Sequence, residues 1–122
     1  MTQGRRTIQE LLARYDLVPR KALGQHFLAD PNLVAKLVGL VGYEAGKRVV
    51  EVGAGTGSLT RALGMAGFQV VAYEVDERLR PLLAEVLEGL DSVEVRFRNA
   101  LSVLPHDLGQ GPWTLVANLP YN

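Results

Sequence analysis

Hydrophobic positions along the chain follow two patterns, and each pattern predicts one kind of element. Short runs rich in β-branched residues and bounded by turn-forming residues are typical of buried parallel strands, whereas apolar residues three and four positions apart are typical of helices. Strands are expected at 49–52, 69–73, 93–98 and 113–117, and helices at 31–41, 58–65 and 76–90. This alternation indicates an α/β fold, the first half of an open parallel sheet whose ligands bind beyond the carboxyl ends of the strands.

Residues with known capping preferences mark the ends of these helices. Asp30 and Pro31 are typical of an N-cap and a first helical position, and Gly42 is typical of a helix end. Asp76 is expected to cap the helix at 76–90. Pro81 has no backbone N–H, so that helix either starts later than Asp76 or is kinked at the proline.

Three glycines on alternate positions, Gly53, Gly55 and Gly57, follow the first strand directly. A glycine-rich turn between a strand and a helix is typical of nucleotide-binding folds, although an ordinary tight turn has the same composition. A dinucleotide fingerprint requires glycine at position 58, where this chain has Ser58. Glu51 lies at the end of the strand and is suited to a ligand with an ammonium group, held directly or through water.

Other polar residues are placed to reach the same ligand. Glu74 ends the second strand about 20 residues beyond the first glycine, the spacing expected of an acid that binds ribose hydroxyls. The alternative for Glu74 is an exposed acid that precedes a helix. Gly24 indicates a turn, and Gln25 and His26, which follow it, could face a ligand, although His26 is also compatible with a structural histidine.

The composition limits the classes of protein that fit. The chain has 122 residues, no cysteine and a formal net charge of zero. No apolar run reaches transmembrane length and no secretory signal pattern is present, so we expect a single cytoplasmic domain that does not enter a membrane. We also expect no bound metal.

Positive charge is concentrated at the start of the chain. Residues 1–26 contain five basic residues against two acidic ones, a net charge of +3. Thr7 and Glu10 form a capping box at the start of a helical pattern. This helix is either a solvated surface helix or an arm that contacts RNA.

Five segments together resemble the ribosomal RNA adenine N6-dimethyltransferases of the KsgA and Erm types, in the order of that family's motifs. They are 21–30, 51–60, 74–76, 99–101 and 118–121. The resemblance implies a class I Rossmann-like methyltransferase fold, with S-adenosyl-L-methionine as the cofactor. The run Leu-Gly-Gln-His-Phe-Leu and the basic arm are closer to the KsgA type, which dimethylates two adjacent adenosines in the 3′-terminal hairpin of small-subunit (16S) rRNA during ribosome biogenesis.

Three alternatives to the KsgA-type function stay open. The first is an Erm-type methyltransferase of large-subunit rRNA, and the second is a catalytically silent RNA-binding factor of ribosome assembly. The third is a methyltransferase that acts on another planar amine. The presence of Glu51, Glu74 and Asn118 argues against the silent factor, and the adenine-type motif at 118–121 argues against another amine.

The resemblance also implies roles for individual residues. The cofactor-binding residues would be Gln25, His26, Leu28, Glu51, Gly53, Gly55, Gly57, Glu74, Asn99 and Asn118. Among them, His26 and Leu28 would line the methionine end, Glu74 would hold the ribose, and Asn99 would accept from the adenine amine. This chain has His26 where the family usually has asparagine, and Asn99 where it usually has aspartate, yet both side chains keep an acceptor.

The catalytic segment would be Asn118, Leu119, Pro120 and Tyr121. The lone pair of adenine N6 is delocalised into the ring, and two acceptors on the N6 hydrogens favour a more pyramidal nitrogen. The side-chain oxygen of Asn118 and a backbone carbonyl of Leu119 or Pro120 are the candidate acceptors. Pro120 stiffens the loop, and Tyr121 offers a ring on which a flipped base can stack.

The predicted sheet is shorter than that of a complete class I methyltransferase. We therefore expect a fold truncated after the fourth strand, with a basic helical N-terminal arm at 1–29 and the first half of the methyltransferase domain at 30–122. A fragment of this kind is expected to be inactive or weakly active. It is also expected to self-associate through the exposed fourth strand, which is interior in the complete sheet.

Overall fold

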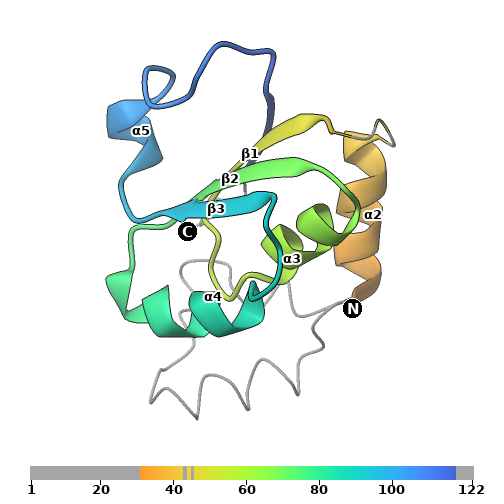
Figure 1. Ribbon diagram of the computed structural model, residues 1–122, viewed down its shortest axis with the longest axis horizontal. Coiled ribbons are helices and arrows are strands. Elements are labelled where there is room, and N and C mark those ends of the chain that lie inside the picture. The colour runs from red at the N-terminus through yellow and green to blue at the C-terminus, as the bar shows by residue number, and fades with distance from the viewer. Residues whose placement is uncertain (1–30, 43, 45, 118–122) are drawn as a thin grey trace.

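The computed structural model of the protein describes residues 31–42, 44 and 46–117 (Figure 1). Its elements are α2 (Pro31–Val41), β1 (Arg48–Val52), α3 (Ser58–Met65), β2 (Gln69–Tyr73), the 3-10 helix η3 (Glu77–Leu79), α4 (Arg80–Val86), β3 (Val93–Arg96), α5 (Ala100–Val103) and β4 (Thr114–Ala117). The strands form one parallel sheet in the order β3-β2-β1-β4. The predicted α/β class and parallel sheet are confirmed.

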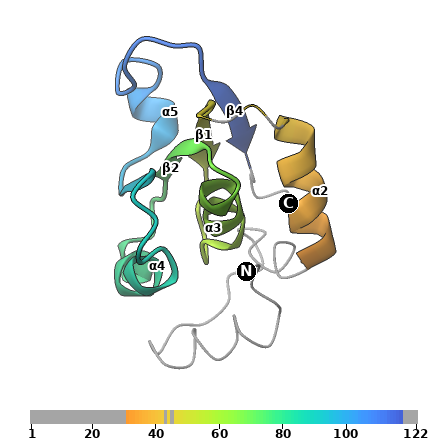
Figure 2. The same cartoon turned by 45° about the vertical axis from the view of Figure 1, so that its right-hand side comes forward.

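Helices cover both faces of the sheet. On one face, Val34 of α2, Leu63 of α3 and Leu82 of α4 belong to the same buried cluster as Val49 and Val70 of the sheet. A second cluster on the opposite face contains Val50, Val71 and Ala100. In Figure 1, α5 and the loop to β4 lie on one side of the sheet and α2, α3 and α4 on the other, and the turned view in Figure 2 shows the same separation. Burial on both faces explains why the central strands β1 and β2 are largely apolar, whereas the edge strand β3 alternates apolar and charged residues.

The strand register brings four chain segments to one edge of the sheet. Val52 at the end of β1 pairs with Tyr73 of β2 and with Ala117 of β4. Tyr73 pairs in turn with Arg96 at the end of β3. The residues that follow β1, β2 and β3 therefore leave the sheet at the same edge, which we call the carboxyl edge.

Several predicted boundaries agree with the structure, and one helix differs. The helices at 31–41 and 58–65 and the strand at 69–73 are confirmed. The single helix predicted at 76–90 is wrong, because residues 77–79 form η3 and α4 runs from Arg80 to Val86. Pro81 lies in the first turn of α4, where its missing N–H costs no helical hydrogen bond. Gly89 adopts a left-handed conformation just after the helix.

The segment between the third and fourth strands also differs from its prediction. The third strand ends at Arg96 and not at position 98, because the backbone N–H of Arg98 turns back to the carbonyl of Arg96 (3.1 Å). The segment between these two strands, for which no helix or strand was expected, contains the short helix α5, whose N-cap is Asn99. The predicted N-terminal arm at 1–29 and the proposed cap Asp30 lie outside the described residues.

Candidate functional site

The glycine-rich turn after β1 depends on backbone conformations that favour glycine. Gly53, Gly55 and Gly57 have φ angles of 90°, 57° and 82°. The backbone N–H groups of Gly53 and Ala54 both donate to the carbonyl of Tyr73, at 2.8 and 3.0 Å, which ties the turn to the end of β2. These two hydrogen bonds fix the position of the turn at the carboxyl edge.

Gly57 has a packing role in addition to its conformation. A Cβ at this position would lie 2.9 Å from Cδ2 of Leu83 and 3.1 Å from Cγ1 of Val86. A side chain at this position would therefore force Leu83 and Val86 of α4 to shift. Gly57 thus allows the start of α3 to pack closely against α4.

Glu51 of β1 is a fully buried acid with one unused oxygen. Its side chain is 0% exposed, and its Oε1 accepts a hydrogen bond from the Thr60 hydroxyl at 2.5 Å. Oε2 has no hydrogen-bond partner among the described residues. Burial raises the pKa of the carboxyl to about 8, against a smaller lowering by the Thr60 hydrogen bond, and the nearby Glu74 charge adds to the rise. Glu51 is thus mostly protonated at neutral pH in this state of the protein.

Glu74 closes the site on the β2 side. It is 5% exposed, so the alternative of an exposed acid before a helix is wrong. Its Oε1 accepts from the backbone N–H of Gly55 at 2.7 Å, and its Oε2 accepts from the backbone N–H of Asp76 at 2.8 Å. Each carboxylate oxygen keeps a second lone pair for a ligand. Asp76 accepts from the N–H of Arg78 at 3.1 Å and caps η3, as predicted.

Asn99 follows β3 at the same edge and caps α5. Its Oδ1 accepts from the backbone N–H of Leu101 at 3.0 Å, and the residue is exposed. The cap leaves one lone pair of Oδ1 for a ligand donor. The role of Asn99 in adenine binding stays a prediction.

Two apolar residues at this edge were not identified from the sequence. Val75 follows Glu74 and is 61% exposed, and Leu101 lies two residues beyond Asn99 and is 85% exposed. Exposed apolar side chains beside a few polar groups are typical of small-molecule sites. Their positions just after the predicted ligand residues are the signal that could have found them.

The remaining predicted site residues lie outside the described part of the chain. These are Gln25, His26, Leu28, Asn118, Leu119, Pro120 and Tyr121. Their roles stay predictions. In the described part, β4 ends at Ala117, which pairs with Val52 at the carboxyl edge.

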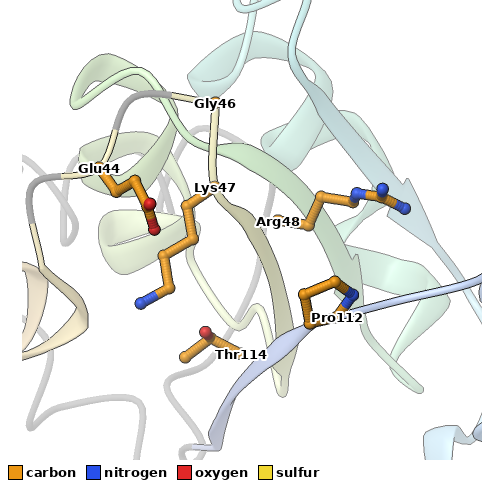
Figure 3. Close-up of a pocket in the computed structure, with 6 residues that line it drawn as sticks. All are labelled: Glu44, Gly46, Lys47, Arg48, Pro112 and Thr114. Atoms are coloured by element: carbon orange, nitrogen blue, oxygen red, sulfur yellow. The ribbon is translucent and has the colours of Figure 1, made fainter.

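A hollow of about 300 Å³ lies at the other edge of the sheet, at the amino ends of β1 and β4 (Figure 3). It is lined by Glu44, Gly46, Lys47, Arg48, Pro112 and Thr114. The amine of Lys47 donates to the carbonyl of Val41 at 2.8 Å, and the guanidinium of Arg48 donates to the carbonyl of Gln110. Both cations therefore hold neighbouring backbone in place, and the hollow is separate from the glycine turn.

The described residues contain neither a candidate membrane-spanning helix nor a candidate metal site. Within 31–42, 44 and 46–117, no helix is long and apolar enough to cross a membrane. The same residues contain no group of three or more histidines, cysteines, aspartates or glutamates placed to hold a metal ion.

The match to a family model decides which family this site belongs to. The model described as ribosomal RNA adenine dimethylase matches residues 18–122 of the chain. The chain belongs to the ribosomal RNA adenine dimethylase family. The resemblance found in the five sequence segments is therefore confirmed.

Named relatives and a solved structure support the dimethylase assignment. Ribosomal RNA small subunit methyltransferase A of Phenylobacterium zucineum is 45% identical over 117 residues, which are 95% of this chain and 41% of that protein. The protein of the same name from Methylobacterium radiotolerans is 48% identical over 118 residues, covering 94% of this chain and 40% of that protein. The crystal structure of the 23S rRNA methyltransferase ErmE is similar with a TM-score of 0.67 and 33% identity, over 75% of this chain and 36% of that chain.

The alignments show which fold the chain has and how much of its relatives' length it covers. The described residues have the Rossmann-like methyltransferase fold, as expected from the sequence. The chain spans about two fifths of the length of the curated relatives that it matches.

Proposed function

We propose that the protein containing this chain is an S-adenosyl-L-methionine-dependent methyltransferase that dimethylates N6 of two adjacent adenosines in the 3′-terminal hairpin of small-subunit rRNA. The observation that carries the proposal is the arrangement of Glu51, the glycine turn, Glu74 and Asn99 at one edge of the sheet, in a chain of this family. Its partner is the small-subunit rRNA or the pre-ribosomal small subunit.

The residues of the carboxyl edge fit this cofactor. Oε2 of Glu51 is buried and has no partner among the described residues, so in the ionised carboxyl it is suited to a positively charged donor such as the α-ammonium of the methionine end. The open lone pairs of Glu74 would accept from the ribose hydroxyls. Asn99 would accept from the adenine amine, and the exposed side chains of Val75 and Leu101 would contact the faces of the ring. When bound, S-adenosylmethionine supplies a methyl group activated by its sulfonium.

The catalytic part of the proposal concerns residues 118–121. Asn118 and a carbonyl of Leu119 or Pro120 would accept the two hydrogens of the target N6, and Tyr121 would stack on the flipped adenine. Orientation and proximity are then the main contributions of the protein, and no general base is needed. Gln25, His26 and Leu28 would cover the methionine end.

The comparisons favour the small-subunit substrate over the large-subunit alternative. The two relatives named for the small subunit are 45% and 48% identical to this chain, whereas the 23S enzyme ErmE is 33% identical over a smaller part of it. Buried Glu51 also argues against a silent RNA-binding factor, because such a factor has no need of a buried carboxyl oxygen that lacks a partner among the described residues.

Mass spectrometry of rRNA tests the proposal in cells that lack the gene. We expect two adjacent small-subunit adenosines to lose both N6 methyl groups, and wild-type protein to restore them. An Asn118→Ala protein, matched for expression, should not restore them. Lost methylation in large-subunit rRNA would replace the proposal with the Erm-type function, and unchanged methylation in both subunits would overturn it.

A further inference from the structure

We propose that Asp107 is a positioning residue that fixes Asn99 relative to Glu74 and so sets the preference of the site for adenine. The inference rests on the proposed function, because it concerns the adenine of the proposed cofactor. Asp107 lies beyond α5, in the segment that leads to β4, and none of the five sequence segments contains it.

One carboxylate joins the ends of two strands to the segment after α5. The hydroxyl of Tyr73, in β2, donates to Oδ2 of Asp107 at 2.7 Å. Arg96, in β3, places Nη1 at 3.0 Å from the same oxygen and also donates to the backbone carbonyl of Asp107. Arg98 donates to Oδ1. Asp107 therefore has bonds to three side chains from the carboxyl edge.

These three partners are neighbours of the predicted ligand residues. Tyr73 directly precedes Glu74, and Arg98 directly precedes Asn99. The backbone N–H of Glu74 also donates to the carbonyl of Arg96 at 3.1 Å. The Asp107 carboxylate thus connects the backbone on which Glu74 lies to the backbone on which Asn99 lies.

The segment from Asn99 to Asp107 is held as one short unit. Asn99 caps α5, the N–H of Leu104 donates to the carbonyl of Ala100 at 2.9 Å, and the N–H of Asp107 donates to the carbonyl of Val103 at 3.0 Å. A displacement of Asp107 is therefore passed through α5 to Asn99 and to the exposed Leu101.

The charge state of this network is fixed over the neutral range. The hydrogen bond from Tyr73, followed by the bonds and charges of Arg96 and Arg98, lowers the pKa of Asp107 below its ordinary value. Burial and the bond to Asp107 raise the pKa of Tyr73. Tyr73 therefore stays a neutral donor, and Asp107 stays a charged acceptor.

Glu94 provides a matched control within the same network. Its Oε2 accepts from Nε of Arg96 at 2.7 Å, so it pairs with the guanidinium that also binds Asp107. The Glu94 side chain is 60% exposed, compared with 18% for Asp107. Glu94→Gln removes an ion pair of Arg96 and keeps every bond of Asp107, whereas Asp107→Asn keeps the size of the side chain and removes its charge.

The experiment uses the longest expressed form of the protein and measures two quantities separately. One is the melting temperature, and the other is the preference for adenine, defined as the ratio of the Kd values of two ligands. Calorimetry gives the Kd of S-adenosylhomocysteine and of its inosine analogue, in which a carbonyl replaces the adenine amine. We expect Asp107→Asn to reduce the preference for adenine by about tenfold, the size of one lost hydrogen bond. Glu94→Gln should keep the wild-type preference. Asp107→Asn combined with Asn99→Ala should lose no more preference than Asn99→Ala alone, because both act through one contact.

The outcomes separate the inference from the proposed function. If Asp107→Asn lowers the melting temperature and keeps the wild-type preference, Asp107 is merely structural and the inference is overturned. If the wild-type protein binds neither ligand, the proposed function fails and the inference fails with it. Should Asp107→Asn not fold, Tyr73→Phe removes one hydroxyl, which donates to Asp107 and accepts from Arg96 at 3.3 Å, and keeps the ring. An unchanged preference in that variant overturns the inference equally.

Discussion

Glu51→Gln replaces a fully buried carboxyl group with an amide of the same shape, and its effect on stability depends on pH. The folded chain raises the pKa of Glu51 from 4.5 to about 8. Between these values the folded state holds a proton that the unfolded state has released, so stability falls as pH rises, by about 1.4 kcal/mol per pH unit. From pH 4 to pH 7 the free energy of unfolding therefore falls by about 3 kcal/mol through Glu51 alone.

Glutamine has no proton to lose, so this loss of stability is absent in Glu51→Gln. The free energy of unfolding of the variant minus that of the wild type should therefore increase by about 3 kcal/mol from pH 4 to pH 7. Urea unfolding of both proteins across this range measures the difference. The low pKa values of Asp107 and Glu94 affect both proteins equally and cancel. A difference that stays constant with pH, or that shrinks as pH rises, would refute the account of Glu51.

Further predictions concern the turn, the pocket and the sheet edge. Gly57→Ala should destabilise the chain by about 1–3 kcal/mol, because its φ is 82° and a Cβ meets Leu83 at 2.9 Å; an unchanged urea midpoint would contradict this. Glu74→Gln should weaken S-adenosylmethionine binding by about 1–3 kcal/mol in calorimetry, while Asn99→Asp should be neutral or mildly favourable, and an undiminished affinity of Glu74→Gln would remove Glu74 from the pocket. The isolated chain should self-associate through β4, which is an edge of the described sheet, and a compact monomer in concentrated sedimentation runs would exclude this.

The sequence predicted best those parts of the fold that depend on local patterns. The helix at 58–65 has apolar residues three and four positions apart, and the strand at 69–73 is a short apolar run. Glycines or polar residues lie at the ends of both. The helix α5 has four residues, too few for a periodic signal, and the Asn99 cap that starts it was interpreted only as a ligand residue. Pro81 allowed two interpretations, and the structure has the later start.

The chemistry of the site was harder to predict because it depends on residues distant in sequence. Glu51 was expected to be a charged partner for an ammonium group, and its raised pKa arises from burial that the whole fold creates. The bond between Tyr73 and Asp107 joins residues 34 positions apart, and no local pattern indicates it. The bonds of Glu74 to the N–H groups of Gly55 and Asp76 show that the acid also holds the glycine turn, which its spacing alone did not indicate.

The most direct test of the central claim is methyl transfer to purified small ribosomal subunits that lack the modification. The longest expressed form of the protein is incubated with isotopically labelled S-adenosylmethionine, and the labelled nucleotides are mapped by mass spectrometry. The account predicts dimethylated N6 on two adjacent adenosines of the 3′-terminal hairpin, and a strong loss of product with Asn118→Ala at unchanged stability. No label on adenine, or label confined to adenosines outside the 3′-terminal hairpin, would contradict it.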